Sequence, residues 1–360
     1  MKRLVAGALT AWTVASVGAF GAGVATAEPG NLWDPALPAA PSLDGTPSAT
    51  VVYAVGGARP PGFPWEYYTM RAGEGFFPNA KRDLIDYPAG APFSWMPTWL
   101  VPGPRDHATI GQAVSQATDK LDAAIHQGTE PAAAIGLSQG ALALDQAQAR
   151  LATDPTAPPP DRLKFTTFGD PSGVNGFGKS FLASIFPPGS YIPLIDYTMP
   201  PQPESQYDSN RIFAAYDGLA DFPDRPDNLI ALINCAFGAA IGHTPAAFAH
   251  RSDAPPQNIR TTINSRGATT TTYMLPVNHL PMTLPLRYLG WPGGLVDQID
   301  ALLQPEIDAA YSHDDDVLSK PISVDPIHGM DPVTSADPST RDSILDAFAQ
   351  VRAIIPPPSG

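Results

Sequence analysis

The sequence predicts an α/β fold in which helices cover both faces of a central, mainly parallel sheet. Short apolar runs alternate along the chain with longer segments of helical periodicity, which is the pattern of strands linked by crossover helices. Each short run is continuously apolar, as expected for strands buried on both faces. The 43 prolines among 360 residues indicate long ordered loops between short regular elements.

The first half of the chain contains three expected strands and two expected helices. A β-branched run over 48–57, which ends in two glycines, and a shorter run over 82–88 predict the first two strands. Apolar residues recur at helical spacing over 109–128, so we expect a helix there. The run over 132–138 is too short for another amphipathic helix and predicts a buried strand. Helical spacing resumes over 139–152.

The second half repeats the alternation around a long insertion. Strands are expected over 164–171, 211–223 and 269–276, and a helix over 295–311. The insertion over 186–210 is rich in proline and aromatic residues. It suits a rigid, lid-like wall for an acyl chain, and equally a proline-stiffened loop packed on the core.

We expect one folded domain over 48–311. Residues 1–27 have a basic start, an uncharged apolar run over 4–24 and an Ala-Thr-Ala site, which is typical of a secretory signal peptide. An uncleaved N-terminal anchor is the alternative, because the run approaches the length of a membrane span. Residues 28–47 form a Pro-rich leader, and 312–360 form a polar extension that can end in a helix.

The charge and the cysteine count exclude several classes of function. A formal net charge of −14 is the wrong sign for a nucleic-acid partner. The single cysteine, Cys235, supports neither a disulfide framework nor a cysteine metal site. No glycine-rich phosphate loop with a following lysine is present, and the acidic run over 312–317 is typical of a solvated tail. We therefore expect no cofactor and no metal.

The segment "AAAIGLSQGALALDQAQAR" over 132–150 contains the strongest signal of chemistry. Gly136-x-Ser138-x-Gly140 between a buried strand and a helix is the nucleophile elbow of α/β-hydrolases. Such a turn presents the hydroxyl at the carboxyl end of the sheet, and it aims the backbone N–H of Gln139 at a developing oxyanion. A buried serine in an ordinary strand–helix turn is the alternative interpretation.

A catalytic serine needs a base and an orienting acid, which follow it in the chain in this fold. Asp170, in "FGDPSG", is typical of a turn former. The segment "YDGLADFPD" offers Asp217 and Asp221, and because Asp-Gly is itself a turn signal, we favour Asp221 as the acid. Spacing alone leaves His243 and His279 open as the base.

Several segments in chain order resemble one known family. "VVYAVGG", "GLSQGA", "TFGDPSGVNGF", "YDGLADFPDRPDNLIALINCAFG", "GHTPAAF" and "LPVNHLPMTLPLRYLG" resemble the PE-PPE domain, a cutinase-like serine α/β-hydrolase domain of mycobacteria and their relatives. The resemblance extends over about 48–311 and is strongest to secreted or membrane-tethered members that acylate trehalose glycolipids. It implies an α/β-hydrolase fold and a Ser-Asp-His triad.

Carried over motif by motif, the resemblance implies that Ser138, Asp221 and His243 form the triad, with Asp217 and His279 as the alternates. It also implies a second oxyanion donor in the loop after the first strand. The residues concerned there, beside Gln139, are Gly57 and Ala58.

The expected function is that of an exported serine enzyme that transfers acyl groups between fatty-acyl esters through a Ser138 acyl-enzyme. The resemblance implies transesterification of acylated trehalose glycolipids of the cell envelope. A carboxylesterase or lipase is the second hypothesis, and a non-catalytic envelope binding protein on a hydrolase scaffold is the third. We expect a lipid or glycolipid substrate, no nucleic acid, secretion or a cell-envelope location, and membrane association through 4–24 if that segment is retained.

Overall fold

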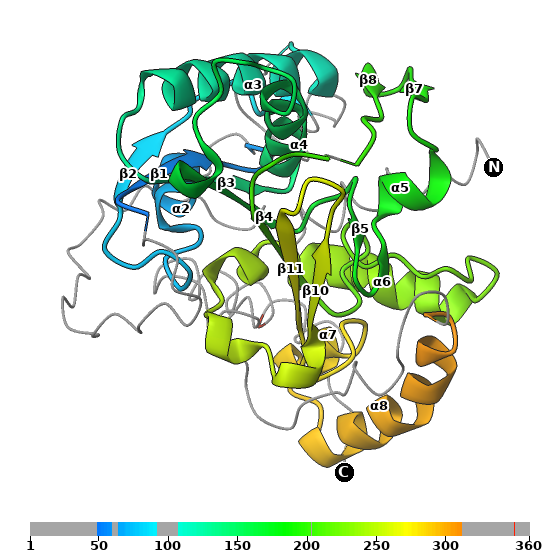
Figure 1. The fold of residues 1–360 in the computed structure, drawn as a ribbon. Helices are drawn as coiled ribbons and strands as arrows, with labels where there is room; N and C mark the ends of the chain where they lie inside the picture. The colour runs from blue at the N-terminus through cyan, green and yellow to red at the C-terminus, as the bar shows by residue number, and fades with distance from the viewer. Residues whose placement is uncertain (1–48, 60–63, 92–106, 203, 312–348, 350–360) are drawn as a thin grey trace.

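A mainly parallel sheet of seven strands runs through the part of the chain that the structure describes (Figure 1). The strand order is β10-β11-β9-β4-β3-β1-β2, and β10 and β11 at one edge form its antiparallel pair. The strands are β1 Val51–Val55, β2 Lys81–Leu84, β3 Ala132–Leu137, β4 Leu163–Phe168, β9 Ser209–Ala214, β10 Ile259–Ile263 and β11 Thr269–Leu275. This computed structural model describes residues 49–59, 64–91, 107–202, 204–311 and 349. The predicted fold class is confirmed.

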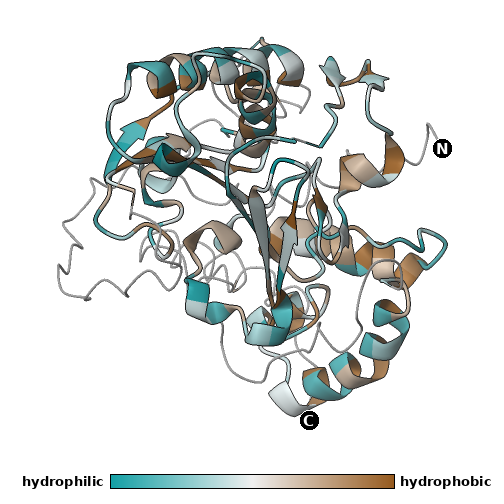
Figure 2. Cartoon of the chain, in the orientation of Figure 1, coloured by the Kyte–Doolittle hydropathy of each residue, from teal (hydrophilic) through white to brown (hydrophobic). Residues whose placement is uncertain are grey.

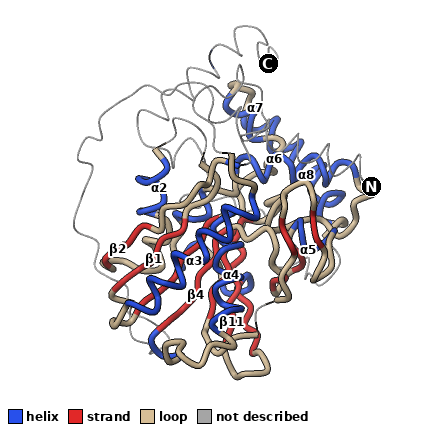
Figure 3. The backbone as a smooth tube through the Cα atoms, turned by 90° about the horizontal axis from the view of Figure 1, so that it is seen from above, coloured by secondary structure: helices blue, strands red, loops and turns tan. Residues whose placement is uncertain are grey.

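Helices cover both faces of this sheet, as Figures 1 and 3 show from two directions. Residues of α3 and α4 belong to the hydrophobic cluster on one face, and residues of α6 and α8 belong to the cluster on the other. Seen from above in Figure 3, α3 and α4 overlie the strands. The helices are α2 Trp65–Arg71, α3 Ile110–Gln127, α4 Gln139–Leu151, α5 Phe181–Ile185, α6 Leu229–Ile241, α7 Leu284–Tyr288 and α8 Gly293–Asp308. None of these described helices is long and apolar enough to span a bilayer.

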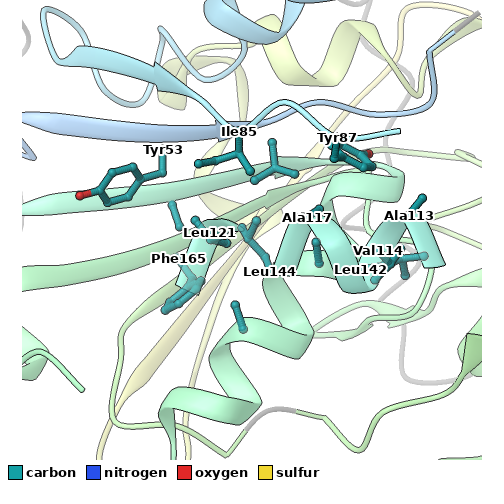
Figure 4. Packing of buried hydrophobic residues seen from close by; sticks show 14 of the residues in the cluster. Tyr53, Ile85, Tyr87, Ala113, Val114, Ala117, Leu121, Leu142, Leu144 and Phe165 are labelled. Carbon is teal, nitrogen blue, oxygen red and sulfur yellow. The ribbon is translucent and has the colours of Figure 1, made fainter. Parts of the chain in front are cut away.

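Two hydrophobic clusters fill the two faces of the sheet because side chains alternate along each strand. On β1, Val51, Tyr53 and Val55 point into the cluster beneath α3 and α4, which Figure 4 shows from close by. Val52 and Ala54 point the other way, into the cluster that α6 and α8 cover. The apolar run of β1 is continuous because its side chains contribute to the core on both faces of the sheet.

The insertion over 186–210 is packed on the domain. Its short strands, β7 Tyr191–Ile192 and β8 Tyr197–Thr198, form a hairpin whose connecting turn contacts the start of α3. The Gly111 N–H donates to the Ile195 carbonyl at 3.0 Å, and the Thr109 hydroxyl donates to Asp196 at 2.9 Å. These bonds fix the turn of the hairpin on the start of α3.

Two sequence expectations for strands differ from the structure. The strand expected over 211–223 ends at Ala214, because the backbone turns sharply at Tyr216, where φ is 63°. The edge strand β10 was not expected, since its polar, half-exposed residues lack the apolar signal used for the other strands. The predicted N-terminal segments over 1–27 and 28–47, and the extension over 312–360 apart from residue 349, lie outside the described residues.

Candidate active site

Ser138 occupies a strained turn at the carboxyl end of β3, immediately before α4. Its φ of 54° and ψ of −115° lie in a region that residues with a side chain rarely adopt. The Ser138 N–H donates to the Phe168 carbonyl at 2.9 Å, and this bond fixes the turn to the end of the neighbouring strand β4. This is the geometry predicted for a nucleophile elbow.

Both glycines of the motif are required by close backbone approach. A Cβ on Gly136 would lie 2.6 Å from the Gly140 carbonyl oxygen, so the strand and the helix touch across the turn. A Cβ on Gly140 would lie 2.6 Å from the Gly56 carbonyl oxygen at the end of β1. The sequence G-x-S-x-G therefore permits the strand, the helix and the first loop to meet at Ser138.

His243 and Asp217 form a buried pair beyond the ends of β4 and β9. The Asp217 Oδ2 atom lies 2.7 Å from His243 Nδ1. The histidine is 4% exposed and the aspartate is fully buried. A carboxylate on Nδ1 fixes the tautomer in which Nε2 carries the free lone pair, which is the form that a general base requires.

The imidazole of His243 lies against the end of β4, next to the strand residue that holds Ser138. A Cβ on Gly169, whose φ is 61°, would lie 2.6 Å from His243 Cε1, so only glycine leaves room for the ring. His243 Nε2 is buried and has no hydrogen-bond partner among the described residues. The structure shows no hydrogen bond between Ser138 and His243, and such bonds often form only when substrate binds.

Asp221 does not make the contact with histidine that we expected of it. Its carboxylate accepts the Tyr216 N–H at 2.7 Å, and its own N–H donates to the Asp217 carbonyl. Asp221 therefore holds the turn on which Asp217 sits. The geometry favours the alternate, Asp217, because a residue that begins an Asp-Gly turn can still direct its carboxylate at a neighbour.

The loop after β1 reaches Ser138. A Cβ on Gly57 would lie 3.2 Å from Ser138 Cβ. Two buried aromatic side chains orient the loop: the Tyr87 hydroxyl donates to the Gly56 carbonyl and the Trp65 indole donates to the Gly57 carbonyl, each at 2.7 Å. The sequence offered no signal for this role of the two aromatic residues.

These two bonds fix the directions of the predicted oxyanion donors. In a trans peptide the C=O and N–H point in opposite directions. Because Tyr87 and Trp65 bind the Gly56 and Gly57 carbonyls, the N–H groups of Gly57 and Ala58 point away from these two aromatic side chains. The next N–H, that of Arg59, donates to Ala89 and is not available.

Gln139 contributes more than a backbone group to this region. Its N–H is the first of α4, where the helix dipole favours negative charge. The residue is 5% exposed, and both side-chain amide atoms are buried with no partner among the described residues. Such atoms are available to a polar group of a bound substrate.

His279, the other candidate base, belongs to a separate pair. Its Nδ1 lies 3.0 Å from Asp300 on α8, and no hydrogen bond connects it with Ser138 or Asp217. His279, Asp297 and Asp300 place their ligand atoms within 4.8 Å of one another, which is a spacing that a cation can use. The Thr283 hydroxyl donates to Asp300, and Arg287 forms an ion pair with Asp297. Both carboxylates therefore already have partners, and we assign no metal here.

A second charged cluster lies buried between α4 and the start of β9. The Arg211 guanidinium contacts Asp170 at 2.5 Å and Asp145 at 3.6 Å, and the Ser172 hydroxyl donates to Asp145 at 3.0 Å. Burial and, to a smaller extent, the charge of Asp170 raise the pKa of Asp145 to about 7. Asp170 also accepts the Ser172 N–H, which fits the turn-forming role predicted for it.

The parallel sheet, the strained serine at its carboxyl edge and the nearby His–Asp pair define a class: the enzymes of α/β-hydrolase fold. The chain belongs to the PE-PPE domain family, whose model matches residues 78–312. It is thus an enzyme of the serine hydrolase fold, an acyltransferase or esterase. No solved structure matched the chain.

Relatives from Mycobacterium tuberculosis include both kinds of enzyme. The chain is 62% identical to the diacyltrehalose acyltransferase Chp2 over 340 residues, covering 93% of this chain and 95% of that protein. It is 38% identical to the SL1278 acyltransferase Chp1 over 314 residues, covering 86% and 70%. It is 30% identical to the esterase PE16 over 232 residues, covering 62% and 42%.

Proposed function

We propose that this chain transfers fatty-acyl groups between acylated trehalose glycolipids through an acyl-enzyme on Ser138. The observation that carries the proposal is the Ser138 elbow beside the His243–Asp217 pair. The similarity to a diacyltrehalose acyltransferase over most of both chains supports the substrate class.

In the first half of the proposed reaction, His243 Nε2 takes the proton of the Ser138 hydroxyl as it attacks the ester carbonyl. Asp217 stabilises the imidazolium through Nδ1. The N–H groups of Gln139 and of Gly57 or Ala58 stabilise the oxyanion, and the loss of one such donor typically costs about 10²–10³ in rate. His243 then returns the proton to the leaving sugar hydroxyl.

In the second half, a sugar hydroxyl of another acyltrehalose gives its proton to His243 and attacks the acyl-enzyme. As this second tetrahedral intermediate collapses, the bond to Ser138 breaks, His243 returns the proton to Ser138 Oγ, and the more highly acylated product is released. The same triad hydrolyses the ester if water replaces the sugar, so transfer requires that the acceptor be held and water excluded. The buried Gln139 amide is suited to hold a sugar hydroxyl.

Product analysis tests the proposal. Purified protein is incubated with an acyltrehalose, and the products are separated by mass. We expect more highly acylated and less acylated trehaloses in equal amounts, and no product with Ser138→Ala. Ser184→Ala, at an exposed serine of α5, is the matched control and should retain activity. Acyl transfer by the Ser138→Ala variant would contradict the proposal.

Hydrolysis is the second candidate function, favoured by the similarity to the esterase PE16. It predicts free fatty acid in place of more highly acylated products in the same incubation. If free acid accumulates while acyl transfer is absent, the chain is an esterase with the same nucleophile.

We further propose that residues 1–27 direct export to the cell envelope, with 28–47 as a leader and 312–360 as an extension outside the catalytic domain. The basic, apolar and Ala-Thr-Ala succession supports this. N-terminal sequencing of protein recovered from the producing cell tests it. A mature chain that begins at Glu28 is the expected result, whereas an intact Met1 on envelope-bound protein would support the anchor.

A further inference from the structure

The helix α6, Leu229–Ile241, has three large apolar side chains on the solvent side. Leu229, Ile233 and Phe237 recur every fourth residue, so they share one face of the helix, and they are 67%, 40% and 37% exposed. We call these three residues the α6 stripe. Brown predominates along α6 in Figure 2. The buried side of the helix consists mostly of small residues: Ala231, Cys235, Gly238 and Ala239, together with Asn234 and Ile241.

The buried side of α6 rests directly on the loop that carries Asp217. The Gly218 N–H donates to the Cys235 carbonyl at 3.0 Å, and a Cβ on Gly238 would collide with the Tyr216 carbonyl. The helix ends at Ile241, two residues before His243. The α6 stripe therefore lies on the outer side of the element that connects the acid and the base of the candidate site.

The charges around the stripe restrict what can bind there. The helix α6 contains no charged residue. Its neighbour α8 contains no lysine or arginine. The two helices are connected by a 2.7 Å hydrogen bond from Asn228 Nδ2, at the start of α6, to the Glu306 carbonyl of α8. Arg225, in the loop before α6, is paired with Asp227. The acidic residues of α8 are Asp297, Asp300, Glu306 and Asp308. An anionic surface would be repelled, whereas an uncharged apolar one would not.

We propose that the α6 stripe docks the enzyme on the surface of an uncharged lipid layer, with the three side chains inserted among the acyl chains. The proposal rests on the proposed function, since acylated sugars are uncharged lipids that assemble into such layers. Docking through α6 would hold Asp217 and His243 close to the lipid layer. Substrate would then enter the candidate site directly from the layer. A helix with an apolar face and no positive charge binds by burial of apolar area alone.

Vesicle binding tests the proposal. The full-length protein is sedimented with phosphatidylcholine vesicles, and a Leu229→Ser, Ile233→Ser, Phe237→Ser variant is compared with it. Each large apolar side chain withdrawn from water contributes strongly to binding, so the variant should bind at least about tenfold more weakly. Ile263→Ser, at a 71% exposed isoleucine on β10, is the matched control and should bind as the unaltered protein does. Added phosphatidylglycerol should weaken binding at low salt.

A site-specific label distinguishes the stripe from any other lipid-binding segment. Ile233→Cys is labelled with an environment-sensitive fluorophore, and Ile263→Cys serves as control; the native Cys235 is 4% exposed, and burial raises the pKa of its thiol, so it should stay unlabelled. When vesicles are added, we expect the emission of the label on Ile233→Cys to rise and that of the label on Ile263→Cys to stay constant. Constant emission at 233 would overturn the proposal. A stripe-dependent dimer in solution, with unchanged vesicle binding, would overturn it in favour of a second copy of the chain.

Turnover of a soluble short-chain ester keeps this proposal separate from the proposed function. The triple variant should turn over the soluble ester at the rate of the unaltered protein, which also shows that it is folded. If the unaltered protein fails to turn over esters, the proposed function fails, while the vesicle and label experiments still decide the docking surface.

Discussion

The two candidate bases, His243 and His279, each pair with a buried aspartate in almost equal geometry but in different surroundings. His243 Nδ1 lies 2.7 Å from Asp217, and His279 Nδ1 lies 3.0 Å from Asp300. In the first pair both side chains are buried, and Nε2 has no partner among the described residues. In the second, the histidine side chain is 24% exposed, and the aspartate also accepts a bond from Thr283.

The difference lies in what surrounds each ring. His243 rests on Gly169, one residue after the strand position that binds the Ser138 N–H, so the elbow and the base share one support. His279 joins the loop after β11 to α8 and has no comparable link to the elbow. The first pair is suited to proton transfer, and the second is suited to holding a helix in place.

Exchanging each histidine for alanine should separate the two pairs most strongly. His243→Ala removes the proposed base, so kcat for ester turnover should fall by about 10⁴ or more. His279→Ala should leave kcat within about threefold and lower the melting temperature, because it removes a partner of a buried carboxylate. Steady-state kinetics and thermal unfolding of both variants provide the measurement. Equal losses of kcat would show that His279 takes part in the reaction.

Substitutions of Asp217 and Asp221, the two acids of the turn beside His243, should differ less in kcat than the two histidine substitutions do. Asp217→Asn keeps the shape but removes the charge that orients and stabilises the imidazolium, so kcat should fall by about 10³. Asp221→Asn can still accept the Tyr216 N–H, and its kcat should fall by less than about tenfold. The ratio of the two kcat values decides the assignment. A larger loss for Asp221→Asn would restore the acid favoured from the sequence.

The loop that carries the proposed oxyanion donors, Gly57 and Ala58, provides a finer test. Tyr87→Phe removes the bond to the Gly56 carbonyl and loosens the Gly57 N–H, so we expect kcat to fall about three- to tenfold with little change in KM. Tyr207→Phe is the matched control, because its buried ring also donates to a backbone carbonyl, that of Pro158 at 2.7 Å. That control should leave kcat unchanged, and equal effects of the two variants would exclude a positioning role for Tyr87.

The smallest expected effect concerns Asp145, whose partner is Arg211 and not a histidine. An unfolded aspartate titrates at about 3.9, whereas burial and Asp170 raise the pKa of Asp145 to about 7 in the fold. Between these values the folded protein retains a proton that the unfolded chain has lost, so stability falls as pH rises from 4 to 7. Asp145→Asn should flatten this dependence in thermal unfolding. An unchanged slope would show that another group causes it.

The fold and the strained turn at Ser138 were predictable because their signals are local. Continuous apolar runs identify buried strands, and the close approach of Gly136 to the Gly140 carbonyl lies within the five-residue motif. The partner of His243 was not predictable in the same way. Asp217 and Asp221 are close in the chain, and the choice depends on the left-handed turn at Tyr216. The roles of Trp65 and Tyr87 depend on contacts across the fold, which no local pattern records.

The central claim is that Ser138, activated by His243, forms the covalent intermediate. A fluorophosphonate probe followed by peptide mapping tests it most directly. We predict one adduct per chain, on the peptide that contains Ser138, formed at the same rate in the His279→Ala variant and far more slowly in the His243→Ala variant. An adduct on another residue, undiminished labelling of Ser138→Ala, or equal rates for the two histidine variants would contradict the account.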